Sequence, residues 1–200
     1  SEKHRWDSTS PAAMRPGNSA TVNCYYRSLH SFFNWLEREE LLTVNPFGKL
    51  KAPKRERKVI RALSPKEVEA LFQACSGKDP LDVRNRAIIM VFLDTGLRLS
   101  ELASLCLHDV DTNTGSIIVR NGKGGKQRVV RIGAKAQKAL WKYVTIYRRG
   151  DGESLFLGRS GESLDPRGVK MLVKRLGIQA GGRVHPHQLR HTFAISFLRA

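Results

Sequence analysis

Acidic residues are scarce in this chain. Its 200 residues contain 18 Asp and Glu against 35 Lys and Arg, which gives a formal net charge of +17. An excess of that size indicates a polyanionic partner, usually nucleic acid and less often an anionic membrane surface. The charge alone therefore favours a protein that binds nucleic acid.

Long apolar runs and paired cysteines are also missing. No run of residues approaches membrane-spanning length, and the N-terminal SEKHRWDSTS lacks the apolar segment of a signal peptide. Cys24, Cys75 and Cys106 are far apart and form no CxxC pair. This usage favours reduced, partly buried thiols over a disulfide framework. We therefore expect a cytoplasmic protein without a membrane partner.

Composition shifts divide the first third of the chain. Residues 1–18 are polar and are interpreted as a loose arm. Apolar residues then recur at helical spacing within 19–48, which predicts a helix with one apolar face, and NPFG at 45–48 is expected to end this helical region. The segment 49–62 is rich in Lys and Arg. It fits a solvated linker and a segment lying along a phosphate backbone equally well.

Helical order restarts at residue 63. Ser64, Pro65 and Glu67 have the spacing of an N-cap with a capping box, which places a domain boundary near residue 60. Glycines are expected to end two of the later helices. The further helices expected lie at 85–96, ended by Gly96, at 99–107, at 134–149, at 165–177, ended by Gly177, and from Pro186 onward.

The segment 115–133 breaks the helical pattern. Two β-branched runs, 117–119 and 129–132, flank a glycine-rich turn and predict a β-hairpin. Residues 154–158 are expected to form a short strand or extended segment. The predicted fold class is therefore mainly α with a small antiparallel β-hairpin or sheet.

The stretch DTGLRLSEL, 94–102, places Arg98 directly after a glycine break. As a surface residue paired with Glu101 at i+3, this arginine would contribute only a few tenths of a kcal/mol. The flanking Leu97 and Leu99 indicate a buried backbone instead. Such a backbone would hold the guanidinium rigidly enough to clamp a phosphate through two hydrogen bonds.

The tip of the predicted hairpin, RNGKGGKQR at 120–128, is basic throughout. It is not a phosphate-binding P-loop, because the GxxxxGK[ST] spacing is absent and the loop joins two strands. It suits either a solvated turn or a basic finger that enters a groove, with one lysine available as a proton donor. The basic residues of this tip are Arg120, Lys123, Lys126 and Arg128.

The stretch HPHQLRHTFA, 185–194, concentrates histidine near the end of the chain. His187 and His191 have the i, i+4 spacing of a zinc helix, but the HExxH glutamate is absent and no metal is expected here. His187 and Arg190, at i and i+3, share a face instead. A titratable ring beside a fixed cation suits a phosphate whose charge grows during reaction. His191 is expected to pack or to cap.

Three of these stretches occur in an order and spacing that resemble the tyrosine recombinases, the phage-integrase family of DNA strand-exchange enzymes. TGLRLSEL resembles the first arginine box of that family, GKGGKQR its hairpin lysine, and HPHQLRHTFA its H-x-L-R-H box. The preceding TVNCYYRSLHSFFNWLEREELLTVNPF resembles the end of the helical core-binding domain. The resemblance covers about residues 60–200 as the front part of the catalytic domain.

The resemblance implies an enzyme that cleaves one DNA strand through a 3′-phosphotyrosine link, without ATP, cofactor or metal. Arg98 and Arg190 would neutralise the non-bridging oxygens of the pentavalent transition state. Lys123 would protonate the leaving 5′-oxygen, and His187 would assist proton transfer or hydrogen-bond the phosphate. Glu101 and His191 would have supporting, structural roles.

The resemblance also divides the chain. Residues 1–18 would be a flexible arm, 19–48 part of a helical, SAM-like core-binding domain, 49–62 a basic linker, and 63–200 the catalytic domain. The two domains would clamp double-stranded DNA, and family members normally act as four protomers on two sites. The remaining expected DNA contacts are Arg120, Lys126, Arg128, Lys54, Arg55, Arg57 and Lys58.

The nucleophilic tyrosine of the family lies some tens of residues beyond the H-x-L-R-H box, and the chain stops before it. Its four tyrosines, Tyr25, Tyr26, Tyr143 and Tyr147, all lie upstream. We therefore expect an internal piece of a longer recombinase that binds DNA in the cytoplasm, at the nucleoid, without cleaving it. The alternatives are a naturally short relative that occupies recombination sites, and a basic RNA-binding or ribosomal protein.

Overall fold

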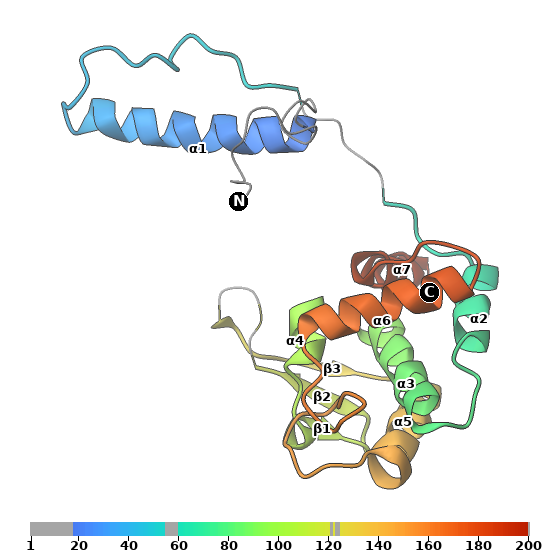
Figure 1. The fold of residues 1–200 in the computed structure, drawn as a ribbon. Helices are drawn as coiled ribbons and strands as arrows, with labels where there is room; N and C mark the ends of the chain where they lie inside the picture. Colours follow the sequence, from blue (N-terminus) through green and yellow to red (C-terminus); the bar gives the residue numbers. More distant parts are fainter. Residues whose placement is uncertain (1–17, 55–59, 121, 123–124, 200) are drawn as a thin grey trace, which may run out of the picture. The chain divides into compact units, whose positions relative to one another are not determined.

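The computed structural model describes residues 18–54, 60–120, 122 and 125–199 (Figure 1). The chain divides into two compact units, Ser1–Val59 and Ile60–Ala200. No helix in the described ranges is long and apolar enough to cross a membrane. The fold class, mainly helical with one small antiparallel sheet, is as the sequence predicts.

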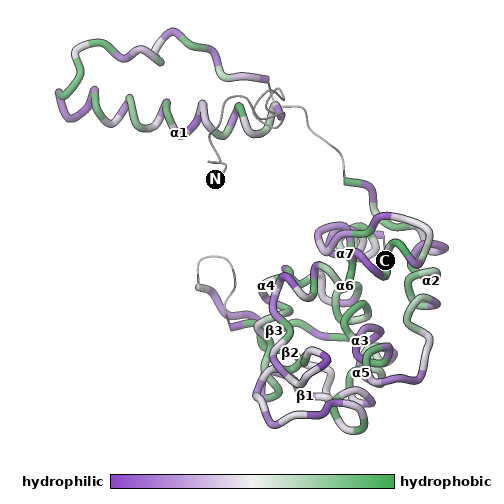
Figure 2. The backbone as a smooth tube through the Cα atoms, viewed as in Figure 1, coloured by the Kyte–Doolittle hydropathy of each residue, from purple (hydrophilic) through white to green (hydrophobic). Residues whose placement is uncertain are grey.

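The first unit is built on one long helix, α1, Ser19–Arg38. The Asn18 side chain accepts the Ala20 N–H at 3.0 Å and begins the helix. Bands of hydrophobic and hydrophilic residues alternate along α1 (Figure 2), as the helical spacing predicts. The helix ends at Arg38, before a residue with positive φ at Glu40, so the helical region ends earlier than the expected stop at 45–48.

The chain after α1 folds back along the helix. The rings of Phe33 and Phe47 stack with centroids 5.0 Å apart, and the Tyr26 hydroxyl donates to the Leu50 carbonyl at 2.7 Å. No residue of α1 is buried, and Cys24 is exposed, contrary to the expectation of partly buried thiols throughout. A wide apolar face of α1 is therefore uncovered within the described residues of this unit.

The second unit is a helical core with a small sheet at one side (Figure 1). The sheet is antiparallel with strand order β1-β2-β3, and β2 pairs with β3 so that Val119 faces Arg128. The helices are α2 (Pro65–Gln73), α3 (Pro80–Thr95), α4 (Leu99–Ala103), α5 (Ala134–Lys142), α6 (Pro166–Gln179) and α7 (Pro186–Arg199), and the strands are β1 (Val110–Asp111), β2 (Ser116–Val119) and β3 (Arg128–Arg131).

Helix α3 is the centre of the core and packs against α5 and α7. Residues 87–93 of this helix are all apolar, within the stretch predicted to be a buried helix, and the Ile88, Ile89 and Phe92 side chains are fully buried. The Asp79 side chain caps its N-terminus by accepting the N–H groups of residues 81 and 82. At its other end Gly96 adopts the left-handed conformation, so the expected stop is confirmed.

Local signals predicted some boundaries correctly and others wrongly. The capping box of Ser64 and Glu67 is present at the start of α2. Gly177, in contrast, does not end α6, which continues to Gln179. A Cβ at Gly177 would lie 2.7 Å from the Val184 nitrogen, so this glycine allows the following chain to pass close to the helix.

Two other expectations needed correction. The helix expected over 99–107 is only α4, five residues long, followed by a 3₁₀ turn at Leu107–Asp109. The short strand β1 was not predicted, because two residues carry no periodicity. It pairs with β2 and completes the sheet. The segment 154–158 forms no continuous strand; it has isolated bridges at Ser154 and Leu157 with a bend between them.

Replacing Gly96 tests how tightly the end of α3 is fixed. Gly96 has a φ of +58°, which is strained for a residue with a side chain. A Cβ at this position would also overlap the Phe193 ring of α7. We expect Gly96→Ala to destabilise the fold by about 2–4 kcal/mol, since strain and overpacking add. Gly181→Ala is the matched control, because Gly181 has φ +81° but open space around it and should cost only about 1 kcal/mol. Urea unfolding measures both; equal losses would contradict the contact with Phe193.

Candidate active site

A cleft of about 530 Å³ opens where the C-terminal end of α3 meets α4, the hairpin and α7. Each of these elements contributes to its wall, and most of the polar side chains are basic. The cleft is lined, among others, by Gly96, Arg98, Lys126, Arg128, Arg190 and Phe193. It therefore gathers residues that lie far apart in the sequence, from Thr95 at one end to Ala194 at the other.

Arg98 is fixed at this cleft by the carboxylate of Glu101. Arg98 is the N-cap residue of α4, and its backbone N–H donates to Glu101 Oε2 at 2.8 Å. Its guanidinium Nη1 donates to Glu101 Oε1 at 2.7 Å. The preceding Leu97 is fully buried, as the sequence indicated. The side chain of Arg98 is 41% exposed, so part of its fork of donors stays open to the cleft.

Arg128 approaches the same carboxylate from the hairpin. Its Nη1 and Nη2 donate to the two oxygens of Glu101 at 3.0 and 2.7 Å, in a bidentate pair. Burial by itself would raise the pKa of Glu101, but the hydrogen bonds from Arg128 and Arg98 outweigh burial and lower the pKa to about 2. Although Glu101 is only 2% exposed, its two arginine partners keep it ionised.

Arg190 reaches the cleft from α7. Its Nη1 donates to the carbonyl oxygen of Gly96, the residue that ends α3. Burial, followed by the positive charge of Arg98, lowers the pKa of Arg190 from its usual value. An arginine remains charged at neutral pH even so. Three guanidinium groups thus line the cleft, and Glu101 pairs with two of them, so the excess positive charge suits an anion with several oxygen atoms.

Residues 61–200 match the family model described as the phage integrase family. The chain belongs to the phage integrase family. The tyrosine recombinase XerC of Chromobacterium violaceum is 40% identical over 176 residues, covering 86% of this chain and 58% of that protein. The chain thus spans about three-fifths of the length of the curated relatives it matches.

Solved structures agree with this membership. XerA recombinase superimposes with a TM-score of 0.63 at 32% identity, covering 87% of this chain and 61% of that chain. The integrase of the Tn1549 transposon, solved with circular intermediate DNA, gives a TM-score of 0.75 at 21% identity over 91% of this chain and 67% of that chain. The predicted family and catalytic fold are therefore confirmed.

The residues predicted from the three family motifs differ in their position relative to the cleft. Arg98 and Arg190 both line it, although they are far apart in sequence. His187 lies exposed in the first turn of α7 and is not among the described lining residues, whereas His191 is half-buried, which fits the expected packing role. Lys123, the expected proton donor, lies outside the described residues.

The expected DNA contacts also differ in their surroundings. Lys126 lines the cleft, and Lys54 is exposed in the first unit. Arg120 donates from Nε to Asp109 Oδ1 at 2.5 Å, so part of its fork is engaged within the protein. Three of the expected basic contacts in the linker lie outside the described residues: Arg55, Arg57 and Lys58.

Sequence reasoning missed two contacts that hold in place the elements around the cleft. The first is the bidentate pairing of Arg128 with Glu101, since Arg128 was predicted only as a DNA contact. The second is Thr192, whose hydroxyl accepts the Leu63 N–H at 2.9 Å and joins α7 to the entry of α2. The spacing of charges offered no signal for the first, because its partners are 27 residues apart.

Proposed function

We propose that the protein acts in site-specific DNA recombination, breaking and rejoining strands through a 3′-phosphotyrosine intermediate. In this reaction a tyrosine hydroxyl attacks the phosphorus, the bond to the 5′-oxygen breaks, and the 5′-hydroxyl leaves. The energy of the broken bond is kept in the new phosphodiester. The named relatives support the reaction class, since they are tyrosine recombinases.

The observation that carries the proposal is the convergence of Arg98 and Arg190 on one cleft. Each guanidinium is held by a group of the protein, Glu101 for Arg98 and the Gly96 carbonyl for Arg190. Preorganised cations stabilise charge that develops in a transition state without reorganising at the moment of reaction. We infer that both contact the non-bridging oxygens of the scissile phosphate.

The remaining roles follow from the family boxes. Lys123 would donate a proton to the leaving 5′-oxygen, and His187 would assist proton transfer or hydrogen-bond the phosphate. Glu101 would be a positioning residue that aims Arg98, with His191 as packing support. DNA contacts are assigned to Lys126, Arg120, Arg128 and the basic linker residues Lys54, Arg55, Arg57 and Lys58. The enzyme would need no cofactor.

A second candidate is a DNA-occupying module without strand cleavage. It is favoured by the surroundings of the tyrosines, because none of the four lines the cleft among the described residues. Tyr143 is 2% exposed and accepts the Leu157 N–H, while Tyr25 lies in the other unit. Both candidates share duplex DNA as partner, at the nucleoid, and the enzyme would further assemble as four protomers on two sites.

Binding of this chain to duplex DNA tests what both candidates share. If about six phosphates are contacted, the affinity should fall about a thousandfold between 50 and 200 mM salt, because each contact releases counterions. Lys126→Ala should lower the salt slope by about one contact. Lys138→Ala is the charge-matched control, since Lys138 lines a separate pocket beside the first half of α3. Fluorescence anisotropy across a salt series measures this.

Two outcomes would count against these assignments. A flat salt response, or tighter binding to structured RNA than to duplex DNA, would remove the shared basis of both candidates. A protein–DNA adduct that survives denaturation and is formed by this chain alone would mean that one of its own tyrosines is the nucleophile. We expect no such adduct, and a denaturing gel with labelled DNA detects it.

A further inference from the structure

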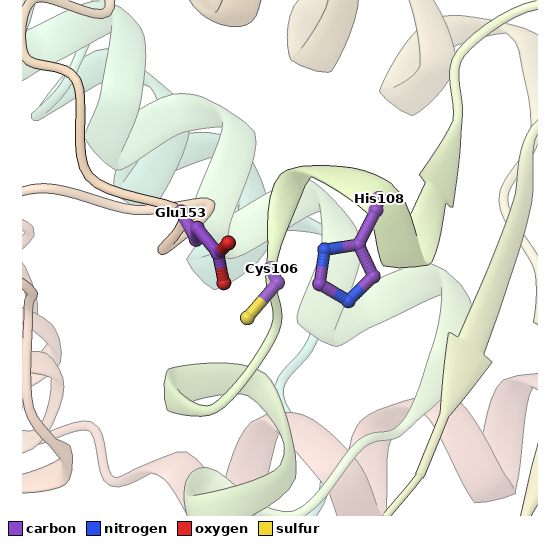
Figure 3. Close-up of side chains that lie close together, drawn as sticks. All are labelled: Cys106, His108 and Glu153. Carbon is purple, nitrogen blue, oxygen red and sulfur yellow. The ribbon is translucent and has the colours of Figure 1, made fainter.

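A second group of reactive side chains lies outside the cleft, where the 3₁₀ turn after α4 meets the loop that precedes α6. The sulfur of Cys106, a ring nitrogen of His108 and a carboxylate oxygen of Glu153 all lie within 4.8 Å of one another (Figure 3). The arginine pair of the cleft does not involve these residues. The cluster therefore has no part in the proposed reaction.

The backbone holds the two segments of this cluster together. The Leu107 N–H donates to the Glu153 carbonyl at 2.8 Å, and the Leu155 N–H donates to the Leu105 carbonyl at 2.8 Å. These bonds frame an antiparallel bridge between Cys106 and Ser154. The relative positions of the three side chains are consequently set by backbone pairing rather than by chance contact at the surface.

The loop that carries Glu153 is fixed from its other side as well. The guanidinium of Arg148 donates to the carbonyls of Gly150 and Ser154, each at 2.8 Å. Side chains on such a tethered frame lose little freedom when they bind a common ligand. The site is thus preorganised in its backbone, while exposed His108 and Glu153 keep rotational freedom at their tips.

Charge around the cluster is also suitable for a cation. A divalent ion that displaced the proton of the Cys106 thiol would be neutralised by the resulting thiolate together with the Glu153 carboxylate, with His108 as a third ligand. The nearby carboxylate of Asp109 already pairs with Arg120 at 2.5 Å. Asp109 Oδ1 also lies 3.8 Å from His108 Nε2, so a further negative charge lies close to the His108 ring.

We propose that Cys106, His108 and Glu153 bind a zinc-type divalent ion, with a fourth position left to water. Thiolate, imidazole and carboxylate together suit Zn²⁺, whereas Mg²⁺ and Ca²⁺ take oxygen ligands. Tetrahedral bonds of about 2.0–2.3 Å would separate the ligand atoms by about 3.3–3.6 Å. Rotation of exposed His108 and Glu153 side chains supplies that contraction. The ion would join the 3₁₀ turn to the loop and stabilise the fold.

Cobalt provides the direct test, because a Co²⁺–thiolate bond gives an ultraviolet charge-transfer band. Titration of the reduced 200-residue chain should saturate at one equivalent, and Zn²⁺ should remove the band. Cys106→Ser should abolish the band, whereas Cys24→Ser, which removes an exposed thiol of the other unit, should keep it. His108→Ala should weaken the affinity at least about tenfold.

Thermal unfolding gives an independent measurement. At a Zn²⁺ concentration about a hundredfold above Kd, the melting temperature should rise by roughly 5–10 °C, and neither Cys106→Ser nor His108→Ala should show the rise. His108 is 55% exposed on its side chain, so its alanine variant should fold even if the cysteine variant does not. A band that persists without Cys106, or no band with reduced thiols, would overturn the proposal.

Discussion

Arg98→Ala should abolish detectable strand cleavage while leaving most of the affinity for DNA. The reaction would be measured in a chimera that joins this chain to the C-terminal segment of the Chromobacterium violaceum relative, which is expected to supply the nucleophilic tyrosine of the family. We expect the rate of covalent adduct formation to fall at least about a hundred- to a thousandfold. The dissociation constant should change less than about tenfold, since Arg98 would be one phosphate contact among several.

The rate should fall more than the affinity because the contact between Arg98 and the phosphate would strengthen in the transition state. Arg98 is held by Glu101 at the cleft, so in the proposed reaction its donors would be in position before the phosphate becomes pentavalent. An interaction that strengthens in the transition state raises the rate, whereas one that is equal in the ground state raises only affinity. Arg98→Lys keeps the charge but loses the planar fork, and should recover only a small part of the rate.

The assay uses duplexes that the wild-type chain selects from a random-sequence library, each with a nick that traps the covalent product. Arg131→Ala is the charge-matched control, because Arg131 is exposed on β3 and is not among the described residues of the cleft. Urea unfolding of each variant separates misfolding from lost chemistry. Equal losses of affinity and rate in Arg98→Ala would make Arg98 a binding residue and contradict its proposed role.

Helix ends could be predicted from the sequence where the interaction that fixes them is between residues close together in the chain. Ser64 and Glu67 are three residues apart and form their capping box from neighbouring backbone groups. Gly96 ends α3 because the chain there adopts positive φ, which glycine accepts without strain. Gly177 carries the same signal, yet its role depends on Val184 passing close by, which no local pattern contains. Its interpretation as a helix end was therefore wrong.

The sequence identified the arginines of the cleft, but it did not predict which ion pairs hold them in place. The family boxes named Arg98 and Arg190, and the packing of α3 against α7 brings them to one site. The spacing of charges could not show that Arg128 would turn inward to Glu101, since this depends on the register in which β2 and β3 pair. The catalytic roles themselves stay predictions until rates are measured.

Glu101→Gln should then be the most destabilising single change at the cleft, at about 3–5 kcal/mol. The carboxylate is 2% exposed and accepts four hydrogen bonds, from the Arg98 backbone, the Arg98 guanidinium and both Nη atoms of Arg128. An amide loses the charge and turns donors toward two guanidinium groups. Urea unfolding at neutral pH measures the loss.

The pH dependence of this loss identifies its cause. The pKa of Glu101 is lowered from 4.5 to about 2 in the folded protein. A lowered carboxyl pKa contributes stability that is complete above the unfolded value and is lost as pH falls through the folded one. The electrostatic part, about 3 kcal/mol, should thus be present above pH 4.5 and disappear toward pH 2. The difference between wild type and Glu101→Gln should shrink across that window.

Glu67 supplies the matched control. Its pKa is also about 2, lowered first by the hydrogen bond from Arg61, but its side chain is 38% exposed at the start of α2. Water screens an exposed pair, so Glu67→Gln should cost only about 0.5–1 kcal/mol with the same pH window. Burial therefore separates two carboxylates that titrate alike. Equal losses in the two variants would mean that the arginine-bound carboxylate of the cleft is no more important to the fold than a surface cap.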